Sequence, residues 1–228
     1  MSQLLLNPPF DYDLPLEFAY AGFKSYLLVN HLTERYEMKK QLKAGQYNLK
    51  DWEIEKIIDM EPSFRNRLII RLLAYCGMRR DEISNLKIDM IDRDSGKVTV
   101  IGKRKKLRSI PCEIKLLNDL LHWAGNRKAG FLFPAKIAHG RGIVPKQINV
   151  IVAAAADRAG IKHPDKSRGK LNPHLLRHSY AHRLKKAGVS MEAISAVMGH
   201  ENINTTVKTY GLLSDDDIQE EINKKVFT

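Results

Sequence analysis

The feature that most constrains the fold is a change in hydrophobic period near the middle of the chain. On either side of residues 88–111, apolar residues recur every three or four positions, the spacing of one helix face. Within that segment the period drops to two, and IDMID, KVTVIG and LRSIP alternate like β-strands. Asp94-Ser95-Gly96 is typical of a tight hairpin turn. The sequence therefore predicts a mainly α domain with a small antiparallel β-sheet (α+β).

The remaining apolar pattern predicts helices over most of the chain. Ser63 is a typical N-cap for the helix FRNRLIIRLLAYC, and Gly77 follows it where a left-handed residue often ends a helix. The segment HPDKSRGK has no periodicity and predicts a basic loop. We expect helices at 51–60, 64–76, 81–86, 113–124, in the second half of 140–160, and at 174–187, 190–198, 203–210 and 215–225.

A break in the helical pattern near residues 45–50 divides the chain. Residues 14–44 carry apolar residues at helical spacing, and Gly45 and Asn48 then interrupt the pattern. From Leu49 onward, one continuous domain is expected. The sequence thus predicts a short N-terminal helical arm over 1–48 and a larger domain with a C-terminal helix over 49–228.

The charge balance points to a polyanionic partner. The chain has 38 Lys and Arg against 26 Asp and Glu, which gives a formal charge of +12 and a pI near 9.6. A domain this basic attracts polyanions, of which DNA is the commonest large one. A merely basic protein, a ribosomal protein or a membrane-surface binder is the alternative on charge alone.

Cysteine use and hydropathy exclude several other classes. Cys76 and Cys112 are far apart in the sequence and too few for a four-ligand zinc site or a secreted disulfide framework. They are expected to be small buried thiols of a reduced protein. No segment has the roughly 20 apolar residues of a membrane helix, and the N-terminus lacks the basic start of a signal peptide. We expect no membrane partner and a cytoplasmic, nucleoid-associated location.

Four separated segments carry chemically active side chains. Arg79 and Glu82 lie one helical turn apart in CGMRRDEISNL, and IGKRKKLRSIP places cations around a hairpin turn. In NPHLLRHS, His174 and Arg177 are at positions i and i+3 and share a helix face. The last segment, MGHENINTTVKTYG, contains His200 and Tyr210.

Together these residue types suit phosphoryl transfer from DNA to a tyrosine. Paired guanidinium groups match the non-bridging oxygens of a phosphate, and a lysine can protonate a leaving oxygen. A tyrosine hydroxyl, with an ordinary pKa near 10, becomes a nucleophile only where positive charge and a base favour its anion. Because arginines can neutralise the developing charge, no metal or other cofactor is required.

The same segments resemble those of the tyrosine recombinase family, of the phage integrase and Xer type. CGMRRDEI is similar to the family pattern TGLRISEL, NPHLLRHS to HxLRHT, and MGHENINTT with its following tyrosine to LGHSxxxTT…Y. The resemblance covers about residues 49–213, with all four segments in the family order. It implies the tyrosine recombinase catalytic-domain fold.

The resemblance assigns three residues to the binding of the scissile phosphate and one to their support. It implies that Arg79 and Arg177 clamp the phosphate and that His200 donates a hydrogen bond to it. Arg79 is preferred to Arg80 because it follows Gly-Met, as the family arginine follows Gly-Leu. Glu82 is expected behind the site, where it orients an arginine.

The resemblance also implies the nucleophile and the proton carriers. Tyr210 attacks the phosphorus and leaves a 3′-phosphotyrosyl link, and His174 accepts its proton or positions the phosphate. Lys103 is the expected general acid for the departing 5′-hydroxyl, because its distance to Pro111 matches the family hairpin. Lys105 and Lys106 are close rivals for that role.

Simpler interpretations compete for several of these side chains. His174, His178 and His182 at helical spacing could suggest a metal stripe, but no carboxylate or thiolate partner is evident, and packing or capping roles are favoured for the last two. Tyr180 is a competing hydroxyl in the middle of a helix among apolar neighbours, so a core position is expected for it.

The predicted function is a site-specific DNA recombinase or integrase that cleaves and rejoins strands without metal or ATP. Two alternatives are a DNA-binding regulator on the same fold and a type IB topoisomerase-like relaxing enzyme. The expected partner is double-stranded DNA. The N-terminal arm is short beside the family's core-binding domain, which leaves room for an accessory DNA-binding or directionality factor.

The C-terminal segment carries a narrow apolar stripe. Ile218, Ile222 and Val226 recur every four residues in SDDDIQEEINKKVFT, and Ser214 is a capping signal before it. Packing onto its own domain is one interpretation. The family resemblance implies instead that this helix docks onto a neighbouring protomer and builds a tetramer on DNA.

Overall fold

The computed structural model describes residues 47–102, 107–135 and 140–199. The chain divides into two compact units, Met1–Ala44 and Gly45–Thr228, and every described residue belongs to the second. The predicted arm over 1–48 and the predicted helices at 203–210 and 215–225 lie outside the described residues, apart from the arm's last two positions. The division at residue 48 therefore stays a prediction.

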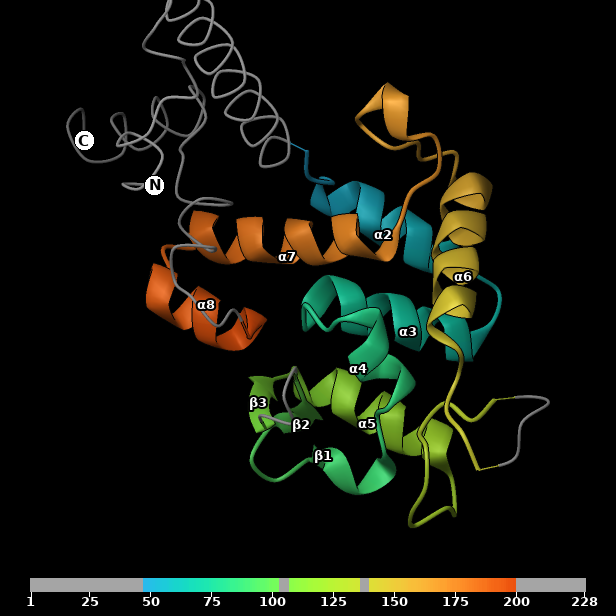
Figure 1. Ribbon diagram of the computed structural model, residues 1–228, viewed down its shortest axis with the longest axis vertical. Coiled ribbons are helices and arrows are strands. Elements are labelled where there is room, and N and C mark those ends of the chain that lie inside the picture. Colours follow the sequence, from blue (N-terminus) through green and yellow to red (C-terminus); the bar gives the residue numbers. More distant parts are fainter. Residues whose placement is uncertain (1–46, 103–106, 136–139, 200–228) are drawn as a thin grey trace, which may run out of the picture. The chain divides into compact units, whose positions relative to one another are not determined.

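The described part is mainly helical with one small sheet, as the hydrophobic periods predict (Figure 1). The helices are α2 Asp51–Asp59, α3 Phe64–Tyr75, α4 Arg80–Ser84, α5 Ile114–Ala124, α6 Pro145–Ala159, α7 Pro173–Lys186 and α8 Met191–Met198, with 3₁₀ turns η1 Ile88–Met90 and η3 Lys166–Arg168. The strands are β1 Ile91–Asp92, β2 Lys97–Ile101 and β3 Leu107–Pro111, joined as an antiparallel sheet in the order β1-β2-β3.

The first predicted strand is wrong over most of its length. Of IDMID, only Ile91 and Asp92 pair with β2, and the preceding residues form a 3₁₀ turn. The N–H of Ile88 donates instead to the carbonyl of Gly130 at 3.0 Å, and that of Met90 closes the turn on Lys87. Because these donors are used elsewhere, the alternating pattern does not extend into the sheet.

Helix α3 forms the centre of the hydrophobic core. Figure 1 shows it between α7 on one side and α5 with the sheet on the other, and α3 packs against both helices. Ser63 caps it as predicted, because its hydroxyl accepts a hydrogen bond from the N–H of Asn66. Its buried residues are Leu68, Ile69, Ile70, Leu72, Leu73 and Ala74.

A second, smaller apolar cluster fastens α8 to α7. Ala181 from α7 packs with Ile194 and Met198 from α8, and all three are buried. Burial of a side chain the size of isoleucine or methionine stabilises by about 1.5–3 kcal/mol. Helix α8 also packs against β3, so its C-terminal end is held between α7 and the sheet.

The two cysteines, distant in sequence, meet behind the turn that follows α3. Their Sγ atoms are 2.9 Å apart, and both are free thiols, Cys76 buried and Cys112 half-buried. The hydrogen bond with Cys112, followed by burial, raises the pKa of the Cys76 thiol well above its ordinary value. Cys76 therefore stays protonated at neutral pH and is a poor nucleophile.

Candidate active site

A cavity of about 480 Å³ opens where the turn between α3 and α4 approaches the beginning of α7. It joins the first and third sequence motifs, although about a hundred residues separate them along the chain. Its lining residues are Leu73, Met78, Arg79, Arg80, Asp81, Asn149, Asn172, Pro173, His174 and Arg177. Three of the predicted catalytic residues therefore lie around one hollow.

A tight turn at Gly77 brings Arg79 to this cavity. Gly77 has φ +58°, and a Cβ added there would collide with the ring of Tyr180, so both the conformation and the packing require glycine. Two residues later Arg79 precedes the first turn of α4, and its backbone N–H donates to Glu82 at 2.7 Å. The backbone is thus fixed at the arginine itself.

Arg177 reaches the cavity from the buried face of α7. Asn172 caps this helix, accepting from the N–H of Leu175 at 3.1 Å. The guanidinium of Arg177, whose residue is only 3% exposed, donates to the carbonyls of Gly77 and Met198. Arg177 therefore joins the α3–α4 turn to the end of α8 while it lines the cavity.

Glu82 lies behind Arg79 as a buried anion. Its carboxylate accepts from the guanidinium of Arg79 at 3.0 Å and from that of Arg108 at 2.9 Å. Burial raises the pKa of Glu82, but the hydrogen bonds and charge of Arg108 and the N–H of Arg79 outweigh it, so the pKa lies below the usual value. Glu82 is therefore ionised and contacts Arg79, one of the arginines that line the cavity.

His174 and His178 form a hydrogen-bonded pair along α7. Their Nε2 atoms are 2.9 Å apart, and the rings meet edge to face. Although His174 is exposed, nearby protein atoms displace part of its water, and this desolvation lowers its pKa; the positive charges of Arg177 and Arg168 lower it further. His174 is consequently neutral at physiological pH and able to accept a proton.

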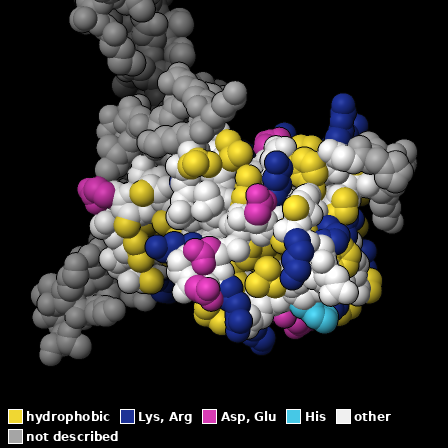
Figure 2. Space-filling view, turned by 90° about the horizontal axis from the view of Figure 1, so that it is seen from below, with side chains coloured by type: hydrophobic (Ala, Val, Ile, Leu, Met, Phe, Trp, Pro, Cys, Tyr) yellow, Lys and Arg dark blue, Asp and Glu magenta, His cyan; other side chains and the backbone are white. Residues whose placement is uncertain are grey.

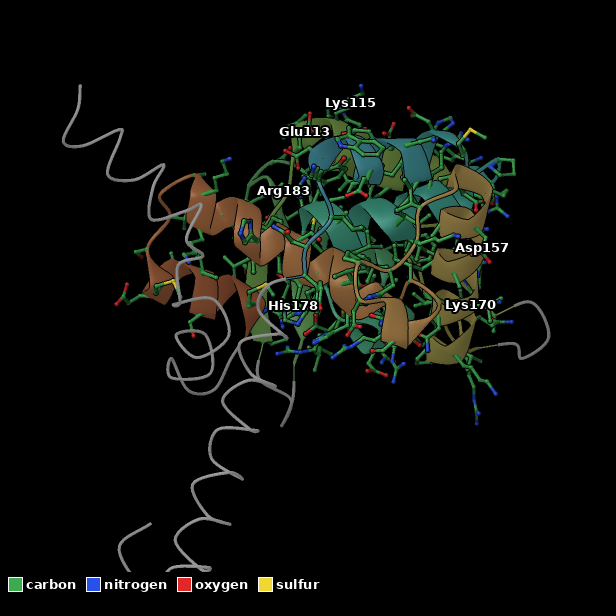
Figure 3. The ribbon with its side chains drawn as sticks, turned by 90° about the horizontal axis from the view of Figure 1, so that it is seen from above. Glu113, Lys115, Asp157, Lys170, His178 and Arg183 are labelled. Atoms are coloured by element: carbon green, nitrogen blue, oxygen red, sulfur yellow. The ribbon has the colours of Figure 1, made fainter. Side chains whose placement is uncertain are left out.

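Arg183, near the end of α7, has a structural role. Figure 3 labels His178 and, further along the same helix, Arg183. The guanidinium of Arg183 lies 4.7 Å from the ring centre of Tyr75 and pairs with Asp51 of α2. This arginine therefore ties α7 to α2 and α3 and is separate from the cavity.

Tyr180 has the environment of a core residue, in agreement with its expected role. It is half-buried, packed against the cluster of α7 and α8, and its ring faces Gly77. Burial, with smaller contributions from the neighbouring cysteines, raises the pKa of Tyr180 to about 12. A hydroxyl that resists ionisation so strongly is a poor nucleophile.

Four arginine side chains lie close to His174 at the cavity. Arg79, Arg80, Arg168 and Arg177 are all close enough to lower its pKa by charge. On the face drawn in Figure 2, Lys and Arg side chains are interspersed with apolar and acidic ones. Among the described residues, no group of three His, Cys, Asp or Glu side chains could hold a metal ion.

The remaining predicted site residues lie outside the described residues. These are Lys103 with its rivals Lys105 and Lys106, His200 and Tyr210. Chain neighbours of Lys103 and His200 are described: Gly102 follows β2 directly before Lys103, and Gly199 ends α8 with φ +62° directly before His200. The second guanidinium nitrogen of Arg79 donates to the Gly199 carbonyl at 2.8 Å, so the described site reaches the residue adjacent to His200.

The profile of the phage integrase family matches residues 48–216, which is most of the chain. The chain belongs to the phage integrase family. Membership confirms the resemblance carried by the four motifs, and with it a tyrosine recombinase catalytic domain.

Curated relatives of this phage integrase-family chain are tyrosine recombinases. XerA of Pyrococcus furiosus is 32% identical over 184 residues, which are 78% of this chain and 62% of the relative. XerA of Pyrococcus horikoshii is 28% identical over 216 residues, 92% of this chain and 73% of the relative. XerC of Pseudomonas fluorescens is 33% identical over 147 residues, 62% of this chain and 46% of the relative. The chain thus spans less than two thirds of two of these relatives.

Solved recombinase structures share the fold. The crystal structure of XerA recombinase aligns with a TM-score of 0.66 and 24% identity, covering 78% of this chain and 65% of that one. XerH site-specific recombinase bound to its difH substrate aligns with a TM-score of 0.61 and 24% identity, covering 78% and 54%. The catalytic-domain fold predicted from the motifs is therefore confirmed.

Sequence reasoning missed the second partner of Glu82. Arg108 lies in the cationic segment IGKRKKLRSIP, where only the lysines had suggested a role. Its pairing with Glu82 spans 26 residues and joins a strand to a helix, so no local spacing signals it. The carbonyls of Gly77, Met198 and Gly199, which hold the arginines, give no signal in side-chain motifs either.

Proposed function

We propose that this protein is a site-specific DNA recombinase that cuts and rejoins strands through a covalent bond to Tyr210. The observation that supports it most is the convergence of Arg79, Arg177 and His174 on one cavity. That convergence occurs in a chain of the phage integrase family whose curated relatives are named tyrosine recombinases.

The two arginines supply the electrostatic part of the reaction. A phosphate in the cavity meets two guanidinium groups of its lining, that of Arg79 from the α3–α4 turn and that of Arg177 from α7. Positive groups fixed before the reaction stabilise charge that develops on the phosphoryl oxygens, and one such donor is commonly worth about 100-fold or more in rate. This role needs no metal ion or other cofactor.

The proton steps fall to groups on either side of the phosphate. The phenolic oxygen of Tyr210 forms the bond to phosphorus while its proton passes to neutral His174. The bond from phosphorus to the 5′-oxygen breaks, and Lys103 gives that oxygen a proton. A 5′-hydroxyl of a second strand reverses these steps, so the phosphodiester is remade without ATP. His200 supports the phosphate, and Glu82 orients Arg79.

Double-stranded DNA is the proposed partner. Among the structural neighbours, XerH was solved with its difH substrate and the Tn1549 transposon integrase with circular intermediate DNA. The formal charge of +12 predicts affinity that falls steeply with salt, because bound phosphates release counterions. A flat salt response would contradict a DNA clamp.

Assembly and location are proposed from the family and the sequence. The segment 215–225 docks onto a neighbouring copy in a tetramer on DNA, and an accessory factor supplements the arm over 1–48. Truncation after Leu213 is expected to remove higher-order complexes from gel shifts. The proposed location is with the chromosome in the cytoplasm. Separately, none of the described helices is long and apolar enough to cross a membrane.

Covalent capture of DNA tests the reaction and the nucleophile together. Duplexes carrying a nick near candidate sites, or supercoiled plasmid where no site is known, should give a protein–DNA adduct that survives denaturation. Tyr210→Phe should abolish the adduct, and the matched control Tyr180→Phe should retain it. An adduct that survives Tyr210→Phe would place the nucleophile elsewhere, and no adduct on any DNA would favour a binding-only protein.

The two alternative functions are not favoured. A binding-only regulator predicts loss of cavity residues, yet Arg79, His174 and Arg177 are present and converge. A type IB topoisomerase shares the covalent chemistry, but the curated relatives are recombinases. Relaxation of supercoils by a monomer without exchange of DNA segments is the outcome that would favour the topoisomerase.

A further inference from the structure

Arg108 of β3 contacts the phosphate-binding machinery from behind. Its side chain is only 11% exposed, and its guanidinium grips both carboxylate oxygens of Glu82. Its Nε also donates to the carbonyl of Val197 at 2.9 Å. No polar atom of Arg108 lines the cavity, so any effect on the reaction passes through other residues.

The end of α8 is held by three arginines on three consecutive carbonyls. Arg108 binds the carbonyl of Val197, Arg177 that of Met198, and Arg79 that of Gly199. The last carbonyls of a helix have no partner within it and carry its negative dipole end, so cations there are stabilising. Gly199 also admits this arrangement, because a Cβ on it would come within 2.6 Å of the Arg108 guanidinium.

The charges around Glu82 determine how much of the positive charge of Arg79 is available to a phosphate. The Glu82 side chain is 3% exposed, so its negative charge must be neutralised by neighbours. Arg108 does this with a two-pronged contact, whereas Arg79 gives a single guanidinium nitrogen, and its side chain stays 34% exposed. With Arg108 in place, two cations share one carboxylate and a net positive charge remains.

Without Arg108, the direct salt bridge that remains to the buried Glu82 carboxylate among the described residues is that of Arg79, with the charge of Arg177 acting on it as well. The attraction between opposite charges is strong where water is excluded. Arg79 would then be drawn into a full salt bridge with Glu82, away from the cavity. The α8 end next to His200 would lose one of its three arginine contacts at the same time.

We propose that Arg108 is a positioning residue of the active site, which neutralises Glu82 and holds the end of α8 so that Arg79 keeps its charge for the scissile phosphate. This inference rests on the proposed cleavage reaction. Neither the sequence motifs nor the comparisons assign Arg108 a role.

A double-mutant comparison separates this role from a merely structural one. Arg108→Met should slow covalent adduct formation by about tenfold to 100-fold, the range expected when a distant change misplaces a catalytic group. Glu82→Gln in the same chain removes the unneutralised charge, so the double variant should recover part of the lost rate. A structural defect would instead leave the double variant no faster than Arg108→Met.

A neutral scissile linkage gives a second, independent readout. A methylphosphonate at the cleavage position carries no charge and demands less of Arg79. The rate ratio between wild type and Arg108→Met should therefore shrink on this substrate. An unchanged ratio would overturn the charge argument, whatever the absolute rates are.

Two further variants keep the test decisive. Arg71→Met removes an arginine of the same kind, paired with Asp119 away from the cavity, and should cleave like wild type. Arg108→Lys keeps the positive charge but cannot contact both carboxylate oxygens of Glu82 at once. Its rate of adduct formation should lie between those of wild type and Arg108→Met. This variant provides the test if Arg108→Met does not fold. No adduct from wild type would refute the cleavage function, whereas a fully active Arg108→Met beside an active wild type would refute only the role of Arg108.

Discussion

Arg79 and Arg177 line the same cavity, but the molecule holds them in different ways. Arg177 is buried on α7, and both of its terminal nitrogens donate to backbone carbonyls of other segments. Arg79 extends from a turn, keeps a third of its side chain exposed, and is held by one carboxylate and one carbonyl. Arg177 is thus part of the packed interior, whereas Arg79 extends from its surface.

This contrast indicates that similar chemistry can depend on different parts of the fold. A buried arginine satisfies carbonyls that would otherwise lack hydrogen-bond partners. Its replacement should therefore destabilise the folded protein and also abolish DNA cleavage. A half-exposed arginine with a shared carboxylate should affect chiefly the reaction. Stability and cleavage measured on the same variants can therefore separate the two.

Arg177→Met should have the largest combined effect. The buried carbonyls of Gly77 and Met198 lose these donors, and each unsatisfied group costs about 1–3 kcal/mol. We expect the free energy of unfolding in urea to fall by about 2–5 kcal/mol and adduct formation to be lost. An unchanged unfolding midpoint would show that the contacts of Arg177 with the carbonyls are not structural.

Arg79→Met should separate activity from stability. Glu82 keeps its contact with two guanidinium nitrogens of Arg108, so the free energy of unfolding should change by less than about 1 kcal/mol. Adduct formation should fall by about 100-fold or more, the usual effect of losing one fixed donor to a developing charge. If Arg79→Met is as unstable as Arg177→Met, the proposed difference between the two arginines is wrong.

Gly77→Ala should disturb the turn on which Arg79 is mounted. The left-handed conformation and the collision with Tyr180 together are expected to lower the free energy of unfolding by about 1–3 kcal/mol. Gly188→Ala is a matched control, since Gly188 has φ +78° but open space around it, and should cost about 1 kcal/mol. Equal losses in thermal or urea unfolding would show that the packing against Tyr180 is unimportant.

A small pH effect should come from His174. Its pKa is lowered in the folded protein, so between that pKa and the ordinary value of 6.5 the unfolded chain binds more protons. Stability should therefore fall as the pH is lowered through 6.5. His163 also has a lowered pKa, so the test is the difference between wild type and His174→Gln, whose curve should lack part of this decline. Superimposable curves would contradict the lowered pKa of His174.

Local patterns predicted the fold well where hydrogen bonds are local. The caps and apolar spacing of α3, and the alternation of β2 and β3, involve partners close in the chain, and these elements lie where they were expected. The IDMID segment failed because its N–H groups go to Gly130 and Lys87. The alternation of apolar and polar residues alone does not predict which segment a potential strand will pair with.

The candidate site divides in the same way. Motif order and spacing identified Arg79, His174 and Arg177, and the structure brings all three to one cavity. The importance of Arg108 could not be predicted, because its partners Glu82 and Val197 come from α4 and α8. Nothing near Arg108 in the sequence identifies them.

By itself, the sequence determined the described helices, the two longer strands of the sheet, the family and the residue types of the site, because each depends on spacing along the chain. The tertiary structure alone decided which arginine is buried, which carboxylate Arg79 and Arg108 share, and that the last carbonyls of α8 receive three guanidinium groups. The physical reason is that hydrogen bonds and charge neutralisation act through space, between groups that only folding brings together.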